Sequence, residues 1–307
     1  MAKEPITLYE NLRACSYSPF YLAQLKGLFE DEGLDITLKL SPSPPETAQG
    51  LIDGVADVSF GGPMRVMMHH NEAQLSNKDC PLICFGQVVA RDPFILVGQE
   101  PNPDFHFKDL IGPKIGVATD VPTPWLTLQD DLSRAGIDPS RLNRAPDSSM
   151  IENTELFKKG VIDVVQLIEP YAEEVIAPGG HIWHSFSSRG DIAFTTFYST
   201  KTFVTNRRSA CEALMRAINK SLKMIHDKPA QEIASIICPI FFPNLKIDSY
   251  ARIIDRYKTA NVWPKTTVLP VESFVRLKAA LLSGGLIERD IPYELVIDRQ
   301  LSECGVQ

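Results

Sequence analysis

Long apolar runs are absent from this sequence. A helix that crosses a bilayer needs about 18 or more consecutive apolar residues, and no segment approaches that length. The first five residues lead directly into the strand-like stretch Ile6–Tyr9, without the apolar h-region or cleavage site of a signal peptide. We expect no transmembrane helix. The protein is expected to be cytoplasmic if the sequence as given is native, and periplasmic if a signal peptide was removed.

Cysteine patterns typical of metal sites or disulfide scaffolds are also missing. Six cysteines are too dilute for a disulfide scaffold in a chain of 307 residues. No Cys-x-x-Cys pair occurs, and no second close Cys or His pair stands at zinc spacing. We expect no metal, no cofactor and reduced, mostly buried thiols at Cys15, Cys80, Cys84, Cys211, Cys238 and Cys304.

The sequence lacks a surplus of positive charge. Its 31 Lys and Arg residues stand against 38 Asp and Glu residues, which gives a net charge of -7. Proteins that bind nucleic acids or anionic membranes use basic residues to release counterions, so these partners are disfavoured. The 44% hydrophobic and 22% charged residues are typical of a globular protein. We expect a monomer whose partner is a small molecule.

What is present is an alternation of strand and helix patterns. Leu34–Leu40 alternates apolar and polar residues like a half-buried strand, and Ser18-Pro19 is typical of a helix start with Ser18 as N-cap. The predicted order is strand Ile6–Glu10, a helix from Ser18 to Gly33, strand Leu34–Leu40, helix Glu46–Ile52 and strand Val55–Phe60.

The same pattern returns about a hundred residues later, a period too long for a solenoid repeat. The string Gly33-Leu34-Asp35 has its counterpart in Gly136-Ile137-Asp138, and Gly54–Val58 corresponds to Gly160–Val164. Because both the order and the spacing agree, the sequence predicts two similar α/β lobes.

Beyond residue 190 the pattern changes to one strand followed by helices. Phe194–Thr200 reads as the strand, and helices are predicted at Ser209–His226, Pro229–Cys238, Asp248–Ala260 and Val271–Ser283. These helices should form a C-terminal layer on the first lobe. We place the boundaries near Pro93 and Phe194, so that residues 1–93 and 194–307 form lobe 1 and residues 94–193 form lobe 2. If only two hinge strands cross, the lobes should share little interface.

Several strings together resemble one superfamily. They are Ser18–Gln24, Lys26–Phe29, Glu32–Asp35, Gly54–Val58, Asp109–Gly116 and Ile168–Tyr171. They resemble the type II periplasmic-binding-protein fold, and within it the ABC-transporter solute-binding proteins for sulfonates, nitrate and thiamine-pyrimidine precursors. The fungal thiamine-pyrimidine synthases share that family. The resemblance implies two lobes that close on a small molecule, with an ABC permease as a partner.

The candidate ligand-binding residues follow predicted strands, where loops and helix N-termini of α/β sheets converge on ligands. Gly61-Gly62 would allow close backbone approach, and Arg65 could clamp a carboxylate or sulfonate. The full candidate set is Cys15, Ser16, Tyr17, Gly61, Gly62, Arg65, Thr119, Thr123, Glu169 and Tyr171.

Structural alternatives stand beside these assignments. Gly61-Gly62 is equally typical of a tight turn, and Thr119 and Thr123 of helix caps. Tyr171 suits stacking on a planar ligand or packing between lobes.

Two enzyme activities occur on folds of this kind. The synthases resembled here use a lysine and a histidine where this chain has Gly61 and Arg65, and a cysteine-rich motif that is missing near Ile192–Tyr198. Pyrimidine synthesis is therefore excluded. The sequence also partly resembles a biphenyl sulfinate desulfinase, which uses a cysteine in the first loop and an arginine before a Phe-Gly-Gly string. Cys15 lies in that loop position or one residue from it, and Phe60-Gly61-Gly62 is present, but Ser59 replaces the arginine.

Two functional hypotheses follow. The first is a solute-binding protein of an ABC-type importer that captures a small anionic or heteroaromatic molecule between the lobes. The alternative is a cytoplasmic enzyme on the same fold, with Cys15 as nucleophile. A nucleophilic thiolate needs a cationic neighbour, for which Arg13 and Arg65 are the candidates.

Overall fold

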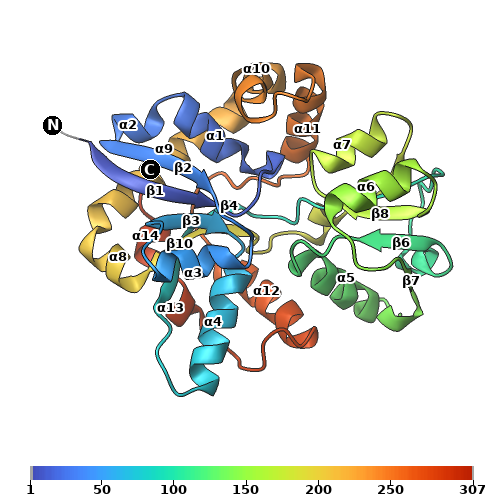
Figure 1. The fold of residues 1–307 in the computed structure, drawn as a ribbon, viewed down its shortest axis with the longest axis horizontal. Coiled ribbons are helices and arrows are strands. Elements are labelled where there is room, and N and C mark those ends of the chain that lie inside the picture. The colour runs from blue at the N-terminus through green and yellow to red at the C-terminus, as the bar shows by residue number, and fades with distance from the viewer. Residues whose placement is uncertain (1–2, 306–307) are drawn as a thin grey trace.

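Two five-stranded sheets organise the chain, which a computed structural model describes over residues 3–305 (Figure 1). The first sheet has the strand order β2-β1-β3-β10-β4. Strands β1, β2 and β3 run parallel, whereas β10 is antiparallel to both of its neighbours. The strands are β1 (Glu4–Glu10), β2 (Leu34–Leu40), β3 (Val58–Gly61), β4 (Leu82–Val89) and β10 (Thr195–Thr200).

The second sheet repeats this arrangement in the order β7-β6-β8-β5-β9. Here β6 is parallel to β7 and β8, and β5 is antiparallel to β8 and β9. Its strands are β5 (Ile95–Gly98), β6 (Lys114–Val117), β7 (Asn143–Arg144), β8 (Val164–Leu167) and β9 (His181–Ser185). We call the first sheet with its helices lobe 1 and the second lobe 2, so the predicted two-lobed α/β fold is confirmed.

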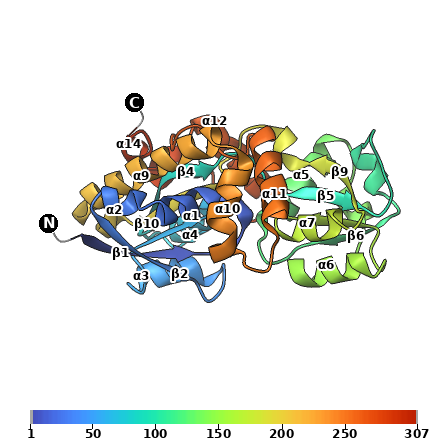
Figure 2. The same ribbon diagram turned by 90° about the horizontal axis from the view of Figure 1, so that it is seen from above.

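Helices cover both faces of the sheet in lobe 1. Helices α1, α2 and α9 pack on one face, above the strands in Figure 1, and α3, α4 and α13 contact strands from the other face, below them. Figure 2 shows the molecule from above, with α2 and α9 over the first sheet. The helices of lobe 1 are α1 (Ser18–Leu25), α2 (Leu28–Asp31), α3 (Glu46–Ile52), α4 (Pro63–Leu75), α8 (Lys201–Asn206), α9 (Arg208–Asp227), α10 (Ala230–Phe241), α11 (Ile247–Thr259), α12 (Val271–Ser283), α13 (Tyr293–Val296) and α14 (Arg299–Ser302). Lobe 2 has α5 (Thr123–Arg134), α6 (Met150–Lys158) and α7 (Tyr171–Ile176). None of the helices described over residues 3–305 combines the length and the apolar character needed to span a bilayer.

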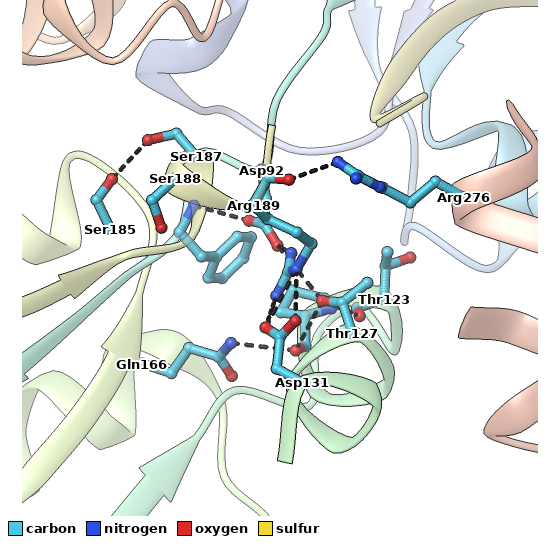
Figure 3. A network of polar contacts seen from close by, with 12 residues as sticks. Asp92, Thr123, Thr127, Asp131, Gln166, Ser185, Ser187, Ser188, Arg189 and Arg276 are labelled. Carbon is cyan, nitrogen blue, oxygen red and sulfur yellow. Dashed lines mark hydrogen bonds and ion pairs between the residues drawn. The ribbon is translucent and has the colours of Figure 1, made fainter. Parts of the chain in front are cut away.

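Residues 90–94 and 190–194 connect the two sheets. The boundaries expected at Pro93 and Phe194 fall inside these segments, although the division into rigid domains stays a prediction. A buried network fixes the connections against α5 (Figure 3): Arg189 binds Asp92 at 2.7 Å and also pairs with Asp131. Asp92 Oδ1 in turn accepts a hydrogen bond from the amide of Phe94.

The expectation of a small interface between the lobes is wrong. Two helices of the C-terminal layer, α11 and α12, reach lobe 2 on opposite sides of the connections (Figure 1). Helix α12 packs on α5, and Leu126 of α5 belongs to the same buried cluster as Phe274 of α12. The sequence shows that these helices are amphipathic but not that their buried faces are divided between two lobes.

The first helix also differs from its prediction. Ser18 is the first residue of α1 rather than its N-cap, and its hydroxyl donates to the carbonyl of Cys15 instead of a helix amide. The helix ends before Gly27, which adopts a left-handed conformation at φ 67°, and α2 follows as a separate turn. A glycine is favoured there because other residues resist positive φ.

Candidate functional site

A small cavity of about 40 Å³ lies where the two lobes meet. Loops after β1 and β3 line it from lobe 1, and loops after β6 and β8 line it from lobe 2. Because pockets that hold organic ligands usually measure about 300–1,000 Å³, this volume is small for such a ligand. The lining residues are Asn11, Leu12, Ser16, Tyr17, Gly62, Met64, Arg65, Phe94, Val121, Thr123, Ile168, Phe194 and Thr195.

Arg65 provides the positive charge of the cavity. It lies in the first turn of α4 and is half-buried. Among the residues described, none forms an ion pair with its guanidinium. Burial lowers the pKa of Arg65 from its ordinary value, but an arginine stays protonated at physiological pH. The cavity therefore contains a cation without a counterion from residues 3–305.

Hydrogen-bond donors accompany this charge on the lobe 1 side. The hydroxyl of Tyr17 donates to Asn11 Oδ1 at 2.7 Å, which fixes the orientation of the Asn11 amide. This orientation places Asn11 Nδ2 near Gly61, since a Cβ on Gly61 would lie 3.1 Å from that nitrogen. The amide nitrogen can donate to an acceptor in the cavity.

Thr123 presents a hydroxyl from lobe 2. It begins α5 and is buried, and its Oγ1 lies 3.0 Å from Met64 Sδ across the lobe boundary. A thioether sulfur is a weak acceptor, so the hydroxyl can exchange this contact for a stronger one with a ligand.

Two helix N-termini meet at the cavity. Helix α4 begins at Pro63 in lobe 1 and α5 begins at Thr123 in lobe 2, and residues in the first turn of each line the cavity. The positive end of a helix dipole lies at its N-terminus, although Pro63 and Pro124 have no amide hydrogen and the amides of Arg65 and Leu126 donate to the carbonyls of Gly62 and Pro122. The arginine, the amide and hydroxyl donors and both helix ends therefore favour a negatively charged group.

Five further residues of the lining are apolar. Leu12, Val121 and Ile168 come from loops of the two lobes, and Phe94 and Phe194 come from the connecting segments. The two phenylalanine rings lie 6.3 Å apart between centroids. Such surfaces suit the hydrocarbon or aromatic body of an organic molecule.

Comparisons with known proteins agree with this architecture. The family model described as NMT1/THI5 like matches residues 15–232. The chain belongs to the NMT1/THI5-like family. It is 26% identical over 295 residues to the binding protein YtlA of Bacillus subtilis (strain 168), a match that covers 94% of this chain and 85% of YtlA. The family resemblance predicted from the sequence is confirmed, and the predicted class of solute-binding protein agrees with the description of YtlA as a binding protein.

One further relative is an enzyme, and one solved structure shares the fold. The chain is 31% identical to 4-amino-5-hydroxymethyl-2-methylpyrimidine phosphate synthase of Schizosaccharomyces pombe over 142 residues, which are 46% of this chain and 38% of the synthase. Its fold is similar to the periplasmic aliphatic sulphonate binding protein SsuA from Escherichia coli, with a TM-score of 0.76 and 14% identity over 97% of this chain and 99% of SsuA.

Half of the candidate residues predicted from the sequence line the interlobe cavity. Ser16, Tyr17, Gly62, Arg65 and Thr123 do so. Their role in binding a ligand stays a prediction. The cavity lining does not include Cys15, Gly61, Thr119, Glu169 and Tyr171.

The environment of Cys15 does not resemble that of a reactive cysteine. The residue is fully buried, and burial is the main cause that raises the pKa of its thiol well above the ordinary value. The charged neighbours that act on it are Glu169 and Glu173, which raise the pKa further. Arg13 instead forms an ion pair with Glu10 at 2.9 Å. An acidic neighbourhood of this kind disfavours the thiolate that a nucleophile needs.

The other candidates outside the lining make contacts within the protein. Thr119 is exposed and donates to the carbonyl of Ser148 at 3.2 Å. Glu169 is fully buried and binds Arg256 of α11. Tyr171 begins α7 and is half-buried, and both burial and the nearby Asp120 raise its pKa.

Sequence reasoning missed several lining residues. Asn11 and Leu12 come directly after β1, so the strand-end argument applied to them as much as to Ser16. Phe94 and Phe194 are hinge residues, for which the sequence gives no signal of exposure to a ligand. Within residues 3–305, no group of three or more His, Cys, Asp or Glu side chains is arranged to hold a metal ion.

Proposed function

We propose that this protein is the solute-binding component of an ABC-type importer and that it captures a small organic anion in the interlobe cavity. The observation that carries the proposal is Arg65, a half-buried cation with no ion-pair partner among the residues described. An unpaired charge in a partly dehydrated site is costly, and an anionic ligand would remove this cost.

The size and lining of the cavity support a mechanism in which the lobes open to admit the ligand. A volume of about 40 Å³ is far too small for an organic anion. Opening at residues 90–94 and 190–194 would separate Arg65 and Gly62 of lobe 1 from Thr123 of lobe 2. Closure would bring all three residues into contact with the ligand. Hinge closure around a bound ligand is a general mechanism of two-lobed binding proteins.

The apolar lining favours an anion with a hydrocarbon or aromatic body over a small inorganic anion. Phe94 and Phe194 would contact that body, while Arg65 and Thr123 would bind its sulfonate or carboxylate. As a binding component, the protein would act outside the cytoplasmic membrane and deliver its ligand to an ABC permease. SsuA, which shares the fold, is periplasmic.

Titration calorimetry with benzenesulfonate, benzoate, methanesulfonate, nitrate and 4-amino-5-hydroxymethyl-2-methylpyrimidine tests the proposal. Benzenesulfonate or benzoate should bind more tightly than nitrate, and the uncharged pyrimidine should bind weakly. Arg65→Met should weaken the best anion by about 10- to 150-fold, because charge-assisted hydrogen bonds contribute about 1.5–3 kcal/mol.

Arg134→Met is the matched control, because Arg134 lies on the exposed side of α5 and pairs with Asp130. It should leave the affinity unchanged. Equal affinities of wild type and Arg65→Met for every anion, or tight binding of the pyrimidine alone, would contradict an anion site.

A further inference from the structure

Four charged side chains that are not part of the cavity lining join the lobes. Helix α11 of lobe 1 supplies Arg252 and Arg256, and in lobe 2 the loop between β8 and α7 supplies Glu169 and α7 supplies Glu173. Helices α7 and α11 lie side by side (Figure 1). Arg256 Nη1 lies 2.9 Å from Glu169 Oε1, and its Nη2 lies 2.7 Å from Glu173 Oε2. Arg252 Nε donates to Glu173 Oε1 at 2.9 Å.

Backbone contacts reinforce this junction. The amide of Cys15 in lobe 1 donates to the carbonyl of Glu169 in lobe 2 at 3.2 Å. The amide of Glu169 donates to the hydroxyl of Tyr257 on α11 at 3.3 Å. Two neighbours of these residues, Ser16 and Ile168, line the cavity. The charged junction therefore forms only when the walls of the cavity are also brought together.

We propose that Arg252, Arg256, Glu169 and Glu173 form an interlobe latch, a set of positioning residues that stabilise the closed state without touching the ligand. This inference rests on the proposed function, because it takes lobe closure to be the step that captures the ligand.

Burial explains why the latch would depend on closure. The side chains of Glu169 and Glu173 are 0% and 3% exposed, and both arginines remain on α11 when the lobes separate. Opening would exchange the ion pairs for hydration of each charge, so the cluster interacts differently with the two states. Only such differential interactions shift a conformational equilibrium. Apparent ligand affinity then falls in proportion to the closed fraction.

The Arg189 network on the other side of the junction does not have this property. Asp92 lies in one connecting segment, and Arg189 and Asp131 lie beside the other and on α5 of lobe 2. These three residues can stay together when the lobes separate, although Arg276 of α12 in lobe 1 also donates to the carbonyl of Arg189 (Figure 3). The ion pairs of the latch all cross between lobes, so separation would break every one of them.

Two variants test the latch, and both can be measured in the protein without ligand. Arg256→Met removes the arginine that binds both carboxylates, and Glu173→Gln removes the carboxylate that binds both arginines. Arg216→Met is the control, because Arg216 makes a comparable ion pair with Glu32 entirely within lobe 1, at 2.6 Å. Small-angle scattering reports lobe separation, and hydrogen exchange reports protection of the Cys15 amide.

In wild type and in the control, the Cys15 amide should be protected. In both latch variants it should exchange at least about tenfold faster, in line with the cost of truncating a buried charge pair, while the amides of β3 keep their protection. The radius of gyration should increase in the same variants.

The proposal is overturned if Cys15 exchanges equally in the latch variants and the control, or if its amide is unprotected in wild type. If Arg256→Met does not fold, Glu173→Gln decides the outcome. A separate titration with benzenesulfonate should show a weaker affinity for both latch variants. If no anion binds but Cys15 exchange responds as expected, the latch stands and the assignment of an anionic ligand fails.

Discussion

Glu169 is a carboxyl whose protonation responds to its burial. Burial raises its pKa from the ordinary 4.5 to about 7, and the opposing attraction of Arg256 is the smaller effect. The titratable and charged groups around it are Arg256 and Tyr257 on α11, Glu173 on α7 and the thiol of Cys15. A protonated Glu169 can still accept a hydrogen bond from Arg256, and Glu173 then carries the negative charge of the latch.

This raised pKa predicts the sign of a pH effect on stability. Below about pH 4.5 the carboxyl is protonated in both the folded and the unfolded protein, and its contribution to the stability of the folded protein is fully present. As the pH rises towards 7, the unfolded protein releases the proton first, so this contribution is lost. From pH 5 to pH 8, the free energy of unfolding of the wild type should fall by up to about 3 kcal/mol relative to that of Glu169→Gln. Denaturant unfolding at the two pH values measures this difference. Parallel pH profiles of the two proteins would refute the raised pKa.

Two adjacent glycines with different roles lie where β3 ends and α4 begins. A Cβ on Gly61 would lie 3.1 Å from Asn11 Nδ2, a tighter contact than packing normally allows. A Cβ on Gly62 would lie 3.7 Å from the Phe194 carbonyl, an ordinary contact, and its φ of -67° suits any residue. Gly62 therefore has room for a methyl group, but this group would take up space in the cavity that it lines.

Gly62→Ala should consequently leave the melting temperature close to that of wild type and weaken benzenesulfonate binding severalfold. Gly61→Ala should lower the melting temperature, because the Asn11 amide and its bond from Tyr17 must shift, at a cost of about 1–3 kcal/mol. Thermal unfolding and calorimetry on the two variants measure both effects. Unchanged binding by Gly62→Ala would show that the ligand does not approach the α4 N-terminus.

Local patterns predicted several elements to the residue. Strand Leu34–Leu40 and helices Glu46–Ile52 and Val271–Ser283 match the structure because their periodicity and flanking residues depend on the local chain alone. The two-lobe organisation followed from the order of such elements. The pairing of Glu169 with Arg256 could not be predicted, because 87 residues separate them and no local pattern shows which lobe α11 contacts.

At the level of the whole molecule, the two sides of the junction use different interactions. Between α7 and α11 the contact is charged, whereas between α5 and α12 it is apolar: Leu126 shares a buried cluster with Phe274, Leu277 and Leu281. Leu126 is thus a lobe 2 residue buried against lobe 1. Leu128 lies two residues away on α5 and is buried in the other cluster, with Leu132 and Phe157 of its own lobe.

These two leucines allow closure to be separated from folding. Leu126→Ala removes an apolar contact that we expect to exist only between closed lobes. It should therefore increase the radius of gyration of the ligand-free protein and weaken the binding of benzenesulfonate. The free energy of unfolding of each lobe should change little. Leu128→Ala should instead lower unfolding stability by about 2–5 kcal/mol, the usual cost of such a core truncation, without altering the scattering of the folded protein. Scattering and denaturant unfolding of both variants check this. If Leu126→Ala lowers stability as much as Leu128→Ala and leaves the scattering unchanged, the lobes do not separate in solution and the ligand must enter by another route.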